Sequence, residues 1–205
     1  MTSQARAAIY PAPNQPFEIR DFPLRNVSDE ELLVRVSMSS ICRSDIHSYH
    51  GHRPNPCPGI LGHEIIGVID QLGAHIQRDL RGDALAVGDR VTWTEYFHHG
   101  KSYYRDVHDM PQKSDGIRKY GHDLADEDPH FLGGFADYCY IMPGTGLLQL
   151  PDSLPADPAM SAKQCSCRRD LRNAGRYYLL QASWLNHDFL QKTLLCLQNN
   201  TKQQK

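Results

Sequence analysis

The sequence predicts a mainly β fold with short helices. From Ala7 to Val91, apolar residues alternate or cluster over stretches of strand length. Between these stretches lie Pro11, Pro13, Pro16 and the polar segment NVSDEE, all typical of turns and loops. The repeated succession of short apolar runs and turns is what a small β-rich domain requires.

The expected elements follow in chain order. The strand-like segments are RAAIYP (6–11), PFEIRDFPL (16–24), ELLVRVSMSS (31–40), GILGHEIIGVIDQLG (59–73), LAVGDRVTW (85–93) and GGFADYCYIMPGTGLLQLP (133–151), the last of which includes turns. CRSDIHSYHG (42–51) is short, polar and ends in glycine, so we expect one or two helical turns there.

Two regions depart from this pattern. Residues 95–130 are polar, rich in histidine and almost free of aliphatic residues, which predicts a long surface lobe. After about residue 160 the strand pattern disappears. Leu190, Leu194 and Leu197 then stand at helical spacing, so residues 161–205 are expected to form a divergent tail with a short helix.

Composition limits the classes of function. Apolar residues make up 40% of the 205, enough for one core, and 22 basic against 24 acidic residues give a net charge of −2. This balance argues against nucleic-acid or membrane-surface partners recruited by charge. No apolar run reaches the ~18 residues of a membrane span, and the N-terminus lacks the apolar core of a secretory signal. A cytoplasmic protein is therefore expected, and its six cysteines are expected to be free or metal-bound.

Three ionisable residues stand out as a candidate site. Cys42, His63 and Glu64 offer the sulfur, nitrogen and oxygen donors that zinc accepts. Adjacent strand residues point to opposite faces, so His63 and Glu64 can share a site only if the backbone turns, a freedom that Gly62 supplies. From the residues alone, a half-buried histidine beside a solvated glutamate remains an open alternative.

The segment GHEIIGVIDQLGAHI (62–76) resembles the zinc-binding signature of the medium-chain, zinc-dependent alcohol dehydrogenases. ICRSDIHSYHG (41–51) is similar to that family's Cys-x-[Ser/Thr]-Asp-x-His segment, VGDRV (87–91) to a turn of the family, and GGFADYCYI (133–141) to the strand that closes its GroES-like domain. The resemblance implies that residues 1–160 form this N-terminal domain, a small twisted β-barrel.

The resemblance also implies roles for individual residues. Cys42 and His63 would be ligands of a catalytic zinc, and Glu64 a transient or outer ligand that tunes it. Ser44 would bond the substrate alcohol, and His47 would pass its proton to solvent. From the residues alone, Ser44 could instead cap a helix, and His47 could be an ordinary exposed histidine.

One departure from the family concerns the lobe. Many members bind a second, structural zinc there through four cysteines. In HHGKSYYRDVHDMPQKS (98–114) those positions are filled by His99, Ser102, Arg105 and Ser114. We therefore expect a lobe without metal, although a replacement site remains conceivable from His98, His99, His108 and His122.

The second departure concerns the cofactor domain. The family's NAD(P) lies on a Rossmann domain with a glycine-rich turn, but the sequence contains no GxGxxG. The expected set of cofactor-binding residues is therefore empty, and the chain resembles a family member truncated before that domain by a frameshift or an alternative transcript. In the family, a third zinc ligand normally follows the linker. Cys165 and Cys167 lie near that position, but the sequence around them does not resemble that of the family.

The expected function is thus zinc-dependent, NAD(P)-linked oxidation of a small-molecule alcohol, impaired in this chain. Two alternatives stay open, namely a non-enzymatic zinc-binding or interaction module, and a chain that does not persist as a stable fold. A homo-oligomer is also left open. The sequence of YHGHRPNPCPGILGHE (49–64) resembles that of a subgroup of the family associated with phosphonate catabolism.

Overall fold

A computed structural model describes residues 3–98, 100–108, 113 and 116–154. Within them the chain is mostly strands with two short helices, so the prediction of a mainly β fold is confirmed. The predicted tail 161–205, its helix and the boundary at residue 160 lie outside the described residues.

The strands are β1 (Gln4–Tyr10), β2 (Glu18–Pro23), β3 (Leu32–Ser40), β4 (Gly59–Ile60), β5 (Glu64–Leu72), β6 (Arg90–Trp93), β7 (Tyr96–His98), β8 (Ile117–Lys119), β9 (Tyr138–Ile141) and β10 (Leu147–Gln149). The helices are α1 (Arg43–Tyr49) and α2 (Tyr103–His108). The helix expected in residues 42–51 is therefore confirmed.

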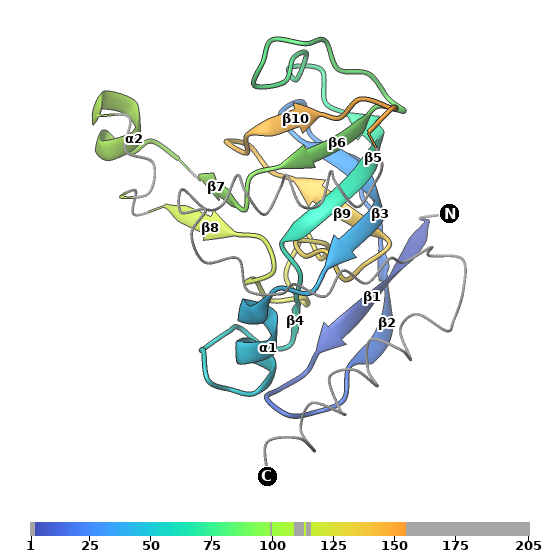
Figure 1. Cartoon of the computed structure of the whole chain (residues 1–205), viewed down its shortest axis with the longest axis vertical. Helices are drawn as coiled ribbons and strands as arrows, with labels where there is room; N and C mark the ends of the chain where they lie inside the picture. The colour runs from blue at the N-terminus through green and yellow to red at the C-terminus, as the bar shows by residue number, and fades with distance from the viewer. Residues whose placement is uncertain (1–2, 99, 109–112, 114–115, 155–205) are drawn as a thin grey trace.

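The described strands form three antiparallel sheets (Figure 1). The largest has the order β10-β6-β5-β3-β9, a second has the order β2-β1-β4, and β7 pairs with β8. An antiparallel bridge between Ala7 and Ala136 joins the second sheet to the segment that leads into β9. Helix α1 follows β3 directly and lies beside β4 at one end of the large sheet.

The core lies around β3 and β5, which are the longest strands and pair with each other. Ile65 and Ile66 are adjacent on β5 and both are buried. Ile65 faces the main core, whereas Ile66 packs with Met38 in a second, smaller apolar cluster on the other side of the sheet. Burial on both faces explains why this strand reads as a continuous apolar run.

The predicted surface lobe is shorter than residues 95–130. Strands β7 and β8 and helix α2 project to one side of the large sheet, and Tyr103 and Val107 are 65% and 63% exposed. Tyr120 and Ala125, in contrast, are buried in the core. The prediction was wrong for this part because it relied on missing aliphatic residues, while an aromatic ring and an alanine fill the space. Among the described helices, none is long and apolar enough to cross a membrane.

Candidate metal centre

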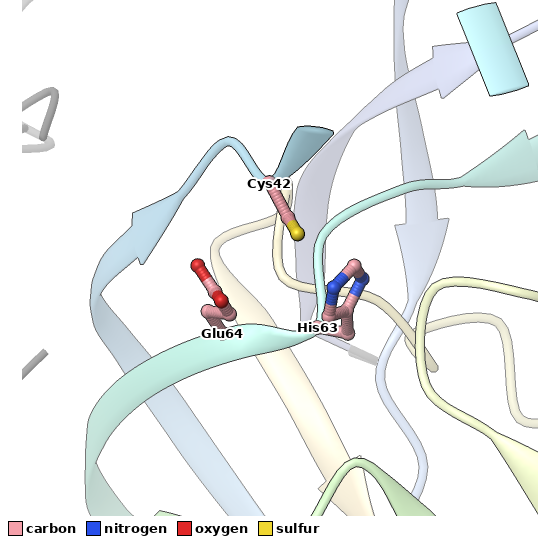
Figure 2. Close-up of side chains that lie close together, drawn as sticks. All are labelled: Cys42, His63 and Glu64. Atoms are coloured by element: carbon pink, nitrogen blue, oxygen red, sulfur yellow. The ribbon is translucent and has the colours of Figure 1, made fainter. Parts of the chain in front are cut away.

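Cys42, His63 and Glu64 come together where β3, α1 and β5 meet (Figure 2). One ligand atom from each lies within 4.8 Å of the other two, and His63 and Glu64 are buried. Gly62 makes this possible with φ of +90°, so that His63 precedes β5 and points to the same place as Glu64. The predicted turn at Gly62 is thus present.

The three donor atoms fit a zinc ion. Zinc binds cysteine sulfur at about 2.3 Å and histidine nitrogen or carboxylate oxygen at about 2.0–2.2 Å, which places the ligand atoms of a tetrahedral site about 3.5 Å apart. The three donor atoms lie within 4.8 Å of one another, so the side chains would have to close around the ion by up to about 1 Å to complete the geometry.

A single buried carboxylate organises both ligand segments. Asp45 accepts hydrogen bonds from the Cys42 N–H (2.8 Å) and from the Gly62 N–H (3.1 Å). Its Oδ1 also lies 3.5 Å from Nδ1 of His63, a buried nitrogen that has no hydrogen-bond partner within the usual limits among the residues that the structure describes. An acidic group on this side holds the imidazole with Nε2 directed into the site.

Glu64 has a partner of its own in the site. The hydroxyl of Ser40, the last residue of β3, donates a hydrogen bond to Oε2 of Glu64, and both residues are buried. This contact ties the carboxylate to the β3 side of the site. Glu64 is therefore placed beside the cysteine and the histidine, not exposed to solvent as the alternative interpretation held.

Helix α1 presents the two other predicted residues. The N-cap of the helix is Cys42, so Ser44 does not occupy the capping position that we weighed for it. Its Oγ lies 3.3 Å from Nε2 of His63, on the ligand side of the imidazole. His47 is half-buried and lies three residues further on, where side chains share a helix face with position 44.

The charges around His63 shift its protonation and that of its neighbours. Burial lowers the pKa of His63, but Asp45, Cys42 and Glu95 outweigh it and raise the value to about 11. Burial raises the pKa of the Cys42 thiol, yet hydrogen bonds from His63 and Ser44 bring it below the ordinary value. Burial also raises the pKa of Asp45, and His63 together with the Cys42 and Gly62 amides lowers it overall. The site thus stabilises anionic groups around one cationic position.

Sequence reasoning did not place Glu95 or His122 near His63, although it named His122 as a candidate metal residue of the lobe. Oε1 of Glu95 lies 3.9 Å from Nε2 of His63 and 2.6 Å from Nζ of Lys119. The His122 ring lies 6.1 Å from the His63 ring, measured between centroids. The Gly-His dipeptide occurs at 51–52, 62–63 and 121–122, so this repeat alone does not single out His122.

The other candidate metal residues do not join this centre. Among the residues that the structure describes, Cys42, His63 and Glu64 are the one group with three convergent ligand atoms, so His98, His108 and His122 form no second group of that kind. His99, Ser114, Cys165 and Cys167 lie outside the described residues, as does the Arg105 side chain.

Comparison with known families gives one match that covers most of the chain. Residues 28–152 match the family described as "Alcohol dehydrogenase GroES-like domain". The matched residues include all of the candidate centre.

Individual proteins are similar over the same region. A 5-exo-hydroxycamphor dehydrogenase of Pseudomonas putida is 30% identical over 174 residues, which are 84% of this chain and 46% of that protein. The crystal structure of an alcohol dehydrogenase of Thermotoga maritima superposes with a TM-score of 0.71 at 28% identity, covering 78% of this chain and 44% of the other. An Escherichia coli alcohol dehydrogenase complexed with NADH gives a TM-score of 0.61 at 26% identity, covering 77% and 42%. The chain spans less than half the length of these relatives.

Proposed function

Because the chain belongs to the family defined by the alcohol dehydrogenase GroES-like domain, we propose that Cys42, His63 and Glu64 form the catalytic zinc centre of an NAD(P)-linked alcohol dehydrogenase. The observation that carries this proposal is the convergence of their ligand atoms within 4.8 Å in a site that is largely buried. Clusters of acidic groups on an exposed surface are common without a bound metal. A thiol, an imidazole and a carboxylate that converge at the end of a core strand are not a common chance arrangement.

The contacts of the three ligands indicate the role of each at the metal. Cys42 and His63 are the principal ligands, since Asp45 fixes the backbone beside each of them. Glu64 is the adjustable ligand because its carboxylate is shared with the Ser40 hydroxyl. Bound zinc would act as a Lewis acid that lowers the pKa of an alcohol oxygen.

Two residues of α1 would handle the substrate and its proton. Ser44 lies on the Nε2 side of His63, where its hydroxyl can bond the alcohol oxygen. His47 lies on the same face of the helix and is partly exposed, so that it can release a proton to water. These roles are the ones that the family resemblance implies for the two positions.

The hydride acceptor is the second part of the proposal. The E. coli neighbour was solved with NADH, and we extend a nicotinamide cofactor to the complete enzyme to which this domain corresponds. The sequence itself contains no glycine-rich phosphate-binding turn. We therefore propose that this chain, taken alone, binds metal but turns over poorly.

The test measures metal and dinucleotide binding separately on the 205-residue chain. After loading with cobalt, the visible spectrum should show a tetrahedral site with a thiolate ligand, at one ion per chain. Cys42→Ser and His63→Ala should abolish this spectrum, whereas the exposed controls Cys57→Ser and His75→Ala should retain it.

Nicotinamide fluorescence then reports NADH and NADPH binding by the same sample. Metal binding without dinucleotide binding supports the centre and assigns the missing step to the cofactor. A folded chain that binds no cobalt contradicts the metal centre itself.

A further inference from the structure

A largely buried ion pair between Glu95 and Lys119 lies beside the candidate centre. Glu95 is in the connection between β6 and β7, and Lys119 is the last residue of β8. Pairing of β7 with β8 sets Lys119 opposite Tyr96, the residue after Glu95. Nζ of Lys119 lies 2.6 Å from Oε1 of Glu95, and the two side chains are 17% and 11% exposed. The pairing of the two strands thus brings the charges together.

The carboxylate of this pair lies at ligand distance from one member of the centre. Oε1 of Glu95 is 3.9 Å from Nε2 of His63, close to the spacing of about 3.5 Å between ligand atoms in a tetrahedral zinc site. Among the described residues, however, the group of ligand atoms within 4.8 Å of one another contains Cys42, His63 and Glu64, without Glu95. A fourth protein donor therefore lies at the edge of the centre but outside it.

Lys119 is the group that holds the carboxylate in this place. Within the described part of the chain, Lys119 forms an ion pair with Glu95 alone, and the other charged partner of Glu95 is His63. The ammonium also lies 5.3 Å from the centre of the Tyr96 ring, a second attraction that fixes its position. Without this cation the buried carboxylate would need another positive charge, and a metal ion bound by His63 would supply it.

The number of protein ligands decides what a zinc site can do. Structural sites are closed by four protein ligands, whereas catalytic sites have three and keep one position open for another molecule. Cys42, His63 and Glu64 supply three ligand atoms. A fourth bond from Glu95 would close the centre, so a catalytic centre requires that Glu95 be held aside.

We propose that Lys119 is a positioning residue whose ammonium holds the Glu95 carboxylate away from the metal, so that the centre keeps one coordination position open. This inference rests on the proposed function, since it concerns a metal bound by Cys42, His63 and Glu64. Lys119 acts through Glu95 and contributes no ligand of its own.

The test measures the open position with imidazole, which changes the visible spectrum of cobalt when it binds to the metal. Imidazole is titrated into the cobalt-loaded 205-residue chain at about pH 8, where it is largely neutral, and cobalt affinity is measured in parallel. The unsubstituted chain should bind imidazole. In Lys119→Met, imidazole should bind about 10–100-fold more weakly because Glu95 takes the open position, and cobalt should bind more tightly because the metal has gained a ligand.

Three further variants assign these shifts to the ion pair. Lys119→Arg keeps the charge and should behave like the unsubstituted chain. Adding Glu95→Gln to Lys119→Met removes the competing carboxylate, so imidazole binding should return and cobalt affinity should fall back to its starting value. The control is Arg118→Met, which removes a cation of the same strand that pairs with Asp123 instead (2.7 Å), and it should change neither measurement.

The direction of the change in cobalt affinity distinguishes positioning from damage to the fold. A disturbed centre binds cobalt more weakly, whereas the expected result in Lys119→Met is a gain. Lys119→Gln is measured alongside, because its amide can still donate a hydrogen bond to Glu95 but carries no charge. It should show smaller shifts in the same directions, and it decides the question where Lys119→Met does not fold.

The outcomes separate this inference from the function on which it rests. An unsubstituted chain that gives no cobalt spectrum overturns the proposed function, and the positioning role falls with it. A normal cobalt spectrum with imidazole binding that is unchanged in the folded Lys119 variants overturns the positioning role alone. The same holds for an unsubstituted chain that binds cobalt but no imidazole, and for a loss of imidazole binding that persists after Glu95→Gln is added.

Discussion

The candidate centre and the lobe use similar residues but differ in how the chain holds them. In the centre, His63 is 4% exposed and receives contacts from β5, from α1 and from the segment around Gly121. In the lobe, His108 is exposed at the end of α2 and its nearest ring is Tyr103, five residues away. Metal-binding residue types are thus present in both regions, but long-range packing converges them in the centre. The following variants are ordered from the largest expected effect to the smallest.

Gly62→Ala should break the centre most severely. Its Cβ would lie 2.7 Å from the Phe135 ring, and φ of +90° is unfavourable for alanine. We expect a loss of about 2–5 kcal/mol of unfolding free energy in urea denaturation, together with weaker cobalt binding.

Gly100→Ala is the matched control in the lobe. Gly100 has φ of +73°, but among the described residues, its chain neighbours aside, no atom lies within 4 Å of an added Cβ. The cost should be confined to the backbone, about 1–2 kcal/mol. Equal costs at the two positions would show that the contact with Phe135 contributes nothing.

Asp45→Asn should weaken the centre without removing a ligand. The amide can replace one of the accepted hydrogen bonds but not the negative charge near His63. We expect cobalt affinity to fall by about 10–100-fold, the range typical of groups that orient metal ligands.

Asp106→Asn serves as the corresponding control in the lobe. Asp106 accepts a hydrogen bond from the Ser102 N–H at the start of α2. Asp45 likewise accepts one from the Cys42 N–H at the start of α1. Cobalt affinity should stay within a factor of two of the unsubstituted chain. A fall as large as that of Asp45→Asn would mean that the lobe supports the centre.

Glu31→Gln extends the comparison to a buried ion pair outside both regions. Glu31 accepts two hydrogen bonds from Arg25 (2.7 and 2.9 Å), and its carboxylate is 8% exposed. The Arg25 hydrogen bond, opposed by burial, lowers the pKa of Glu31 below 4.5. A lowered pKa stabilises the fold above the unfolded-state value, and this stabilisation is lost as pH falls through the folded-state value.

The variant should therefore be less stable by about 1–3 kcal/mol at pH 7, and the difference should shrink below about pH 4.5. Glu18→Gln removes an exposed pair with Arg20 and should change stability by less than about 1 kcal/mol. A Glu31 effect that is constant with pH would contradict the ionic origin.

Val107→Ser in the lobe should have the smallest effect. Its side chain lies on α2 and is 63% exposed, so little apolar area is lost from the core. Unfolding free energy should change by less than about 0.5 kcal/mol. A loss above 1 kcal/mol in urea denaturation would show that this face is covered by another surface in solution.

Much of the fold could be predicted from local patterns. Strand β3 reads as apolar residues between turns, and the end of the segment 42–51 at Gly51 correctly predicted a short helix. The lobe was predicted too long because Tyr120 was taken as part of a polar segment, although its ring is buried and its hydroxyl bonds Thr145 and the Met142 N–H. Aromatic residues in polar surroundings carry no period that separates core from surface.

The candidate site was predicted in part. Spacing and resemblance pointed to Cys42, His63 and Glu64, and the structure brings these three together. Spacing and resemblance could not reveal that Glu95 and His122 lie near His63, because these residues follow it by 32 and 59 positions in the sequence. The roles of Ser44 and His47 stay predictions that the spectra of the metal-loaded chain can test.

The sequence alone determined the strand-and-turn order, the donor residues and the positions of the glycines, because these depend on short-range periodicity and backbone freedom. Only the tertiary structure decided that Asp45 holds both ligand segments, that Ser40 bonds Glu64, and that Gly121 packs on Gly62 so that the His122 ring lies beside the His63 ring. These contacts join residues whose distance in space is set by sheet pairing and core packing, and no local pattern encodes that distance.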